Sequence, residues 1–176
     1  LGKNIFSHFS NQLAISNRKK YDIEVALKTV DMDEEFHLVY MPICDEQRRI
    51  VSCEALLRWE SKTLGTVPPD EFIPVAESTG LFRKIDYWVV ERALSEFVVL
   101  DAMFGQHFNL AINLSSAELE SNEITSFLEQ IIQEKNIEPS RIELELTETF
   151  AVTEGLMSVK LLDKLVEVGF QIAIDD

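Results

Sequence analysis

Residues 141–147, which read RIELELT, decide the fold class because apolar and polar side chains alternate along them. Successive side chains of a β-strand point to opposite faces, so this segment predicts a strand with one apolar and one polar face. The apolar face carries Ile142, Leu144 and Leu146, and the polar face carries Glu143, Glu145 and Thr147. Residues 108–114 (FNLAINL) and 170–176 (FQIAIDD) repeat the alternation. The sequence therefore predicts several strands whose two faces differ in polarity.

Helical segments are expected between these strands, at residues 124–135 and 154–168. Upstream, Pro68 and Pro69 open a short helix that Gly80 ends, and a longer helix with Ile85 and Ala93 in its apolar stripe follows. Residues 36–43 and 50–59 predict a β-hairpin, and residues 18–32 predict a linker helix. Strands that alternate with helices indicate an α/β fold in which helices cover parallel strands.

The polar residues gather toward the ends of four predicted strands, at Glu54, Asn113, Glu145 and Asp175. Strands of parallel sheets are usually apolar on both faces, so this polar face needs a reason. Ionised carboxylates do not lie buried without a paired charge, water or a metal ion. In a barrel of parallel strands this face is the carboxyl-terminal mouth, where active sites lie. A functional site is one interpretation, and a solvated sheet face is the alternative.

Composition narrows the class of partner. A chain of 176 residues is long enough for one main domain with a sizeable core. The formal net charge is −15, and the only basic run is residues 18–20, so we expect no long nucleic acid as a partner. An acidic protein can bind a phosphorylated small molecule when divalent cations invert the local charge, and carboxylates are the ligands that such cations prefer.

Cysteine usage and hydropathy indicate a cytoplasmic segment that makes no contact with a membrane. Cys44 and Cys53 form no disulfide framework and match no zinc pattern, so we interpret both as reduced thiols. No apolar run is long enough to span a bilayer, and the start does not resemble a signal peptide. Because the chain lacks an initiator methionine, we expect it to be a segment of a longer protein. If that protein is anchored in a membrane, we expect the anchor to lie in another segment.

Five short segments occur in order: CEALLRW at residues 53–59, PDEFIPVAE at 69–77, INLS at 112–115, ELTE at 145–148 and DD at 175–176. Together they resemble the motifs of the EAL family of cyclic di-GMP phosphodiesterases. The resemblance implies a modified TIM-type (β/α)8 barrel that is incomplete here, because the chain ends after the fifth predicted strand. Residues 34–176 would be the amino-terminal portion of that barrel. Residues 1–33 would be a linker helix and the tail of a preceding domain, which resembles a GGDEF domain.

The resemblance also implies a reaction, the hydrolysis of cyclic di-GMP to linear pGpG in bacterial second-messenger signalling, with two Mg²⁺ or Mn²⁺ ions. The metal ligands that it implies are Glu54, Asn113, Glu145, Asp175 and Asp176. Arg58 and the residue at position 41 would contact the substrate. Glu54 and Glu148 would be the catalytic residues, Glu148 by steadying a loop over the site. A surface ion pair is the alternative for Arg58, and a helix cap or an exposed turn is the alternative for Glu148. His8, His37 and His107 belong to none of these motifs.

Two departures from the family pattern keep other readings open. Met41 stands where the family commonly has glutamine, so a hydrogen bond to the substrate would be lost. In the family, a lysine and a further metal-binding glutamate follow the last of these motifs, and both lie outside the sequence. The chain as given would therefore lack part of the active site. A catalytically inactive cyclic di-GMP receptor or interaction module is therefore the alternative function. An unrelated barrel enzyme of sugar or phosphate metabolism is a third possibility. A homodimer would fit the family.

Overall fold

The computed structural model describes the backbone of residues 11–105, 108–115, 123–147 and 155–175, and within these ranges it leaves out the side chains of residues 11–12, 147, 155–159 and 175. The helices and strands follow in the order α1 (Asn11–Lys28), α2 (Met32–Glu35), β1 (Phe36–Cys44), β2 (Ile50–Ser61), β3 (Gly65–Val67), α3 (Pro69–Ser78), α4 (Phe82–Phe104), β4 (Asn109–Leu114), α5 (Glu123–Glu134), the 3₁₀ helix η2 (Pro139–Arg141), β5 (Ile142–Thr147), α7 (Gly155–Val168) and β6 (Gln171–Asp175). From β4 onward, the predicted alternation of strands and helices is confirmed.

One sheet contains all the described strands, in the order β1-β2-β4-β5-β6, with β3 paired to the far end of β2. β1 and β3 run antiparallel to β2, and the other neighbours are parallel. Parallel neighbours joined through a helix are the unit from which (β/α)8 barrels are built. Within the described residues, β1 and β6 are the open edges of this sheet, so the barrel is not closed.

The predicted hairpin between β1 and β2 is confirmed, and Asp45 organises its turn. The Asp45 carboxylate accepts hydrogen bonds from the backbone N–H groups of Gln47 and Arg49, each at 2.9 Å, and from Arg49 Nε at 2.8 Å. These contacts, led by the backbone bond from Arg49, hold the pKa of Asp45 below its ordinary value. Aspartate side chains favour turns because they satisfy nearby backbone donors in this way.

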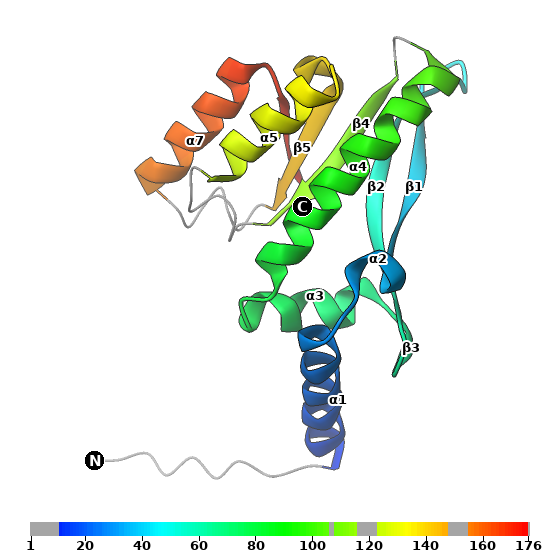
Figure 1. Ribbon diagram of the computed structural model, residues 1–176, viewed down its shortest axis with the longest axis vertical. Coiled ribbons are helices and arrows are strands. Elements are labelled where there is room, and N and C mark those ends of the chain that lie inside the picture. Colours follow the sequence, from blue (N-terminus) through cyan, green and yellow to red (C-terminus); the bar gives the residue numbers. More distant parts are fainter. Residues whose placement is uncertain (1–10, 106–107, 116–122, 148–154, 176) are drawn as a thin grey trace.

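The core lies between the apolar face of the sheet and the helices that cover it. Leu110, Ile112, Ile142 and Leu144 from β4 and β5 are fully buried. Figure 1 shows α4, α5 and α7 on the same side of these strands, and α4 contacts α5 while α5 contacts α7. The alternation of the sequence therefore sorts the apolar residues onto the helix-covered face, as predicted.

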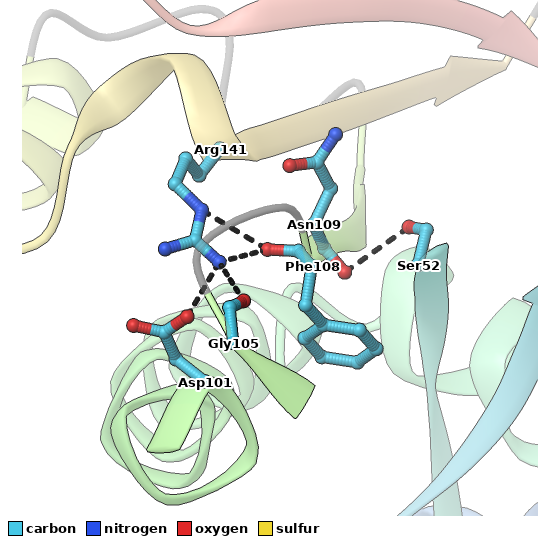
Figure 2. Close-up of polar contacts among 6 residues, drawn as sticks. All are labelled: Ser52, Asp101, Gly105, Phe108, Asn109 and Arg141. Carbon is cyan, nitrogen blue, oxygen red and sulfur yellow. Dashed lines mark hydrogen bonds and ion pairs between the residues drawn. The ribbon is translucent and has the colours of Figure 1, made fainter. Parts of the chain in front are cut away.

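Arg141 fastens the amino-terminal ends of β4 and β5 to the end of α4 (Figure 2). Its Nη2 donates to Asp101 Oδ1 at 2.6 Å, its Nε donates to the carbonyl of Phe108 at 3.0 Å, and Nη2 also reaches the carbonyl of Gly105 at 3.3 Å. The guanidinium lies 5.2 Å from the centre of the Phe97 ring. Because this side chain is largely buried and its Nε and Nη2 donate to three acceptors, the cluster is a structural anchor at the end of the sheet away from Glu54 and Asn113.

Two details of the amino-terminal half differ from the sequence-based expectation. The linker helix, expected at residues 18–32, is α1 at Asn11–Lys28, and Met32 instead begins the short helix α2. The carboxyl-terminal part of α1 packs against α3, and Ile23, Ala26 and Leu27 are buried, while the helix projects away from the sheet in Figure 1. β3 was not predicted, because three residues, Gly65–Val67, are too short to show a period.

Candidate active site

The strand register places the predicted polar residues on one face of the sheet. Asn113 of β4 lies opposite Glu145 of β5, and Glu54 of β2 lies opposite Ala111, two residues before Asn113. The residues that alternate with them along each strand, such as Leu114, are buried on the helix-covered face. Since side chains alternate along a strand, Glu54, Asn113 and Glu145 share the face that the described helices do not cover.

Glu54 and Asn113 are in direct contact. Asn113 Nδ2 donates to Glu54 Oε1 at 2.9 Å, with Glu54 half-buried and Asn113 exposed. An amide that donates through nitrogen still has its carbonyl oxygen as an acceptor, and a carboxylate has several acceptor positions. Glu145, half-buried, lies beside Asn113 in the register. The three side chains therefore offer oxygen donors on neighbouring strands.

The sequence analysis placed Glu54 toward the end of its strand, but β2 continues seven residues further, to Ser61. The parallel pairing between β2 and β4 covers only Ser52–Ala55, however, and the rest of β2 pairs with β1 and β3. Glu54 is therefore near the end of the parallel part of β2. This position brings it level with Ala111 in the middle of β4, two residues before Asn113.

Met41 lies directly opposite Glu54 in the antiparallel pairing of β1 and β2. Its side chain is 50% exposed on the polar face. Directly opposed residues of an antiparallel pair have neighbouring side chains. The thioether of Met41 therefore lies next to the carboxylate of Glu54.

Arg58 is on the same face as Glu54, two alternations further along β2, and is half-buried. Its Nη1 donates to the carbonyl of Leu57 at 2.8 Å. Among the described residues, the structure shows no ion pair for Arg58, and its contact with the substrate remains a prediction. The register also places His37 opposite Arg58, a neighbour that the sequence reasoning missed although its strand phase could have shown it.

A pocket of about 220 Å³ lies beside Asn113 and Arg58, between the sheet, α3 and α4. Apolar residues such as Phe82 line most of it, and Glu77 and Asp86 add carboxylates. Partial burial raises the pKa of Glu77 above its ordinary value. A larger cavity of about 600 Å³ lies beside α1 and is lined by none of the predicted site residues. Proximity to the polar face makes the smaller pocket the better candidate for a ligand.

The described side chains supply only part of the predicted metal-ligand set. No three Asp, Glu, His or Cys side chains within the described ranges come together in a geometry that could hold a metal ion. The backbone register brings Asp175 of β6 opposite Thr147, on the same face as Glu145, but the side chain of Asp175 lies outside the described residues. Glu148 and Asp176, like His8 and His107, also lie outside them.

The donors that are described still fit a hard divalent cation. Glu54, Asn113 and Glu145 supply carboxylate and amide oxygens, the ligands that Mg²⁺ and Mn²⁺ prefer. Cys53, beside Glu54 in sequence, is buried on the opposite face and adds no soft ligand. The fit is one of chemistry, and the full ligand set remains a prediction.

The fold and the polar face together define a class: the sheet is the start of a TIM-type (β/α)8 barrel whose first strand is antiparallel, with carboxylates and an amide on its uncovered face. The chain belongs to the EAL-domain family, because the model of the EAL domain matches residues 24–176. This match begins within α1, and the domain boundary at residue 34 remains a prediction. None of the described helices is both long enough and apolar enough to cross a membrane.

Known relatives extend this comparison. The chain is 40% identical, over 176 residues, to the biofilm architecture maintenance protein MbaA of Vibrio cholerae, covering 99% of this chain and 22% of that protein. It is 36% identical, over 153 residues, to the cyclic di-GMP phosphodiesterase PA2567 of Pseudomonas aeruginosa, covering 85% of this chain and 25% of that protein. The chain thus spans about a quarter of the length of these curated relatives.

Among solved structures, the chain resembles the PaMucR phosphodiesterase in its c-di-GMP complex, with a TM-score of 0.78 and 29% identity. The alignment covers 90% of this chain and 63% of that one. Agreement at this level confirms that the incomplete sheet has the strand arrangement of an EAL domain.

Proposed function

We propose that this chain forms part of a phosphodiesterase that hydrolyses cyclic di-GMP to linear pGpG with two divalent cations, Mg²⁺ or Mn²⁺. The observation that carries the proposal is the contact of Asn113 with Glu54, with Glu145 next to them in the register. Membership of the EAL-domain family supports it, as do a relative named a cyclic di-GMP phosphodiesterase and a similar structure in complex with c-di-GMP.

The residues that would hold the cations are Glu54, Asn113, Glu145, Asp175 and Asp176. Bound divalent cations would supply Lewis-acid polarisation of the phosphate and a more acidic water. The role of the protein would be to hold these oxygens close together at the polar face. Glu54 would serve both as a ligand and as a catalytic residue, and Glu148 would steady a loop over the site.

Charge explains why the cations should also be needed for binding. Cyclic di-GMP has two phosphodiester groups, each with one negative charge, and the chain has a formal net charge of −15. A carboxylate cluster repels such a ligand unless cations invert the local charge. Arg58, on the same face and bordering the pocket near Asn113, is the cation of the protein that we assign to a substrate phosphate.

Met41 favours a second candidate, a catalytically inactive cyclic di-GMP receptor. The thioether lies opposite Glu54 and accepts hydrogen bonds only weakly, where a glutamine would donate and accept them. A receptor of this kind would bind cyclic di-GMP at the polar face but would not release linear product.

One experiment separates the two candidates and tests both. The natural polypeptide that contains this chain is incubated with cyclic di-GMP and Mn²⁺ or Mg²⁺, and linear pGpG is followed by chromatography, with EDTA and Glu54→Gln as the controls. The enzyme proposal expects turnover that EDTA and Glu54→Gln both abolish. Binding without turnover supports the receptor. Absence of binding, or equal competition by duplex DNA, would contradict both.

A further inference from the structure

A buried acidic residue lies next to the proposed site and has no role in it so far. Asp86 of α4 is only 3% exposed, and it accepts a hydrogen bond on Oδ2 from the hydroxyl of Ser115, which is 8% exposed. Ser115 follows β4 directly and is two residues beyond Asn113. The hydrogen bond thus joins the carboxyl-terminal end of β4 to the first turns of α4.

Burying a carboxylate is costly, and an apolar pair of similar size often stabilises a fold equally well or better. Stability alone is therefore a weak reason for this pair. Its place in the fold suggests another reason, because Asp86, Ser115, Asn113 and Arg58 all border the same pocket of about 220 Å³.

The sheet holds Asn113 from the β5 side, where it pairs with Glu145, but not from the β2 side, where Glu54 lies. The pairing of β2 with β4 stops at Ala55 and Ile112, one residue before Asn113. On the β2 side, the described contact that holds Asn113 is its own side-chain bond to Glu54, at 2.9 Å. The position of that amide depends on how the end of β4 is held, and the hydrogen bond of Ser115 to Asp86 ties the end of β4 to α4.

We propose that Asp86 is a positioning residue that, through Ser115, holds the end of β4 so that the Asn113 amide stays in contact with Glu54. This inference rests on the proposed function, because holding Asn113 in place affects the reaction only if Asn113 binds a cation. Partners behind metal ligands usually change metal affinity or activity by about 10–100-fold when they are replaced.

The test compares Asp86→Ala, Asp86→Asn and Ser115→Ala in the natural polypeptide that contains this chain. Tyr40→Phe is the matched control, because it removes another partly buried hydrogen bond to α4, from Tyr40 Oη to Glu96 Oε2 at 2.7 Å, away from Asn113. Thermal midpoints, Mn²⁺ affinity by calorimetry and the side-chain amide resonance of Asn113 in the metal-free, ¹⁵N-asparagine-labelled protein are measured for each variant.

We expect Ser115→Ala and Asp86→Ala to move the Asn113 amide resonance toward its solvent-exposed value and to weaken Mn²⁺ binding about 10-fold. A variant that combines Asp86→Ala with Ser115→Ala should bind Mn²⁺ no more weakly than Asp86→Ala alone, because both changes break the same hydrogen bond. Asp86→Asn, which keeps an acceptor oxygen, should have a smaller effect. Tyr40→Phe should lower the thermal midpoint without moving the resonance or the affinity.

An unchanged Asn113 resonance in both Ser115→Ala and Asp86→Asn overturns the positioning role, even if Asp86→Ala fails to fold. A shifted resonance in a protein that binds no Mn²⁺ in its wild-type form supports the positioning role and refutes the proposed metal site. The amide readout and the metal readout therefore fail independently.

Discussion

Replacing Asn113 by aspartate probes the polar face because it exchanges the donor to Glu54 for a negative charge. In Asn113→Asp, an oxygen takes the place of the nitrogen that lies 2.9 Å from Glu54 Oε1. Two unit charges about 4 Å apart repel by about 1 kcal/mol in water and about 4 kcal/mol at an effective dielectric constant of about 20. Since Asn113 is exposed and Glu54 half-buried, solvent screening favours the lower end. We expect the free energy of unfolding to fall by about 1–2 kcal/mol without cations.

The assay is chemical denaturation at neutral pH, first in EDTA and then with Mn²⁺. Asn109→Asp is the matched control, since Asn109 begins the same strand on the same face and lies opposite Ser52 in the register. That control should change stability by no more than about 0.5 kcal/mol. With Mn²⁺, the loss in Asn113→Asp should disappear, because two carboxylates then share a cation. Equal stability of the two variants in EDTA would refute the proximity argument, and a loss that persists in Mn²⁺ would refute the cation site.

Three further predictions concern other parts of the chain. Burial raises the pKa of Glu35, but hydrogen bonds from the backbone N–H groups of Asp31 and Lys62 and from the Trp59 indole outweigh it and hold that pKa below its ordinary value. Glu35→Gln should therefore lower the free energy of unfolding by about 1–2 kcal/mol at neutral pH; because the folded-state pKa is lowered, denaturation curves should converge as the pH falls through it. Met41→Gln should strengthen cyclic di-GMP binding by about 0.5–1.5 kcal/mol, a several-fold change in the calorimetric dissociation constant, and weaker binding would contradict the assigned contact. An isolated polypeptide of residues 1–176 should not hydrolyse cyclic di-GMP. It should also associate, as measured by light scattering, because the edges at β1 and β6 and the exposed side chains of Val39 and Ile43 lack cover within the described residues. A monomer that hydrolyses cyclic di-GMP would contradict this prediction.

The sequence predicted the polar face because side-chain direction along a strand depends on local alternation alone. Local alternation places Asn113 and Glu145 each on the polar side of its own strand, and the register then brings them together. The motif order was equally local, and it led to the EAL-domain family that the comparisons confirm.

Features that depend on contacts between distant segments could not be predicted. The hydrogen bond between Ser115 and Asp86 joins residues on a strand end and a helix whose proximity follows only from the packed fold. The length of β2 was underestimated because β3, a strand too short to show a period, extends its pairing. The start of α1 was placed too late because Leu13 and Ile15 are exposed and do not continue the apolar stripe that Ile23 and Leu27 define.

Because of the anchor at Arg141, we expect the two ends of β4 and β5 to differ in how well they tolerate substitution. At the amino-terminal edge, the guanidinium of Arg141 donates hydrogen bonds to Asp101, Gly105 and Phe108. Replacing Arg141 would therefore remove several contacts at once and lower the melting temperature. At the opposite edge Asn113 is exposed, and the hydrogen bond between Ser115 and Asp86 is a buried contact there that replacements should also preserve. A library of variants that seeks a new ligand should therefore leave the Arg141 edge intact and vary the opposite one, since a scaffold whose stability is secured at one end can accept chemical change at the other.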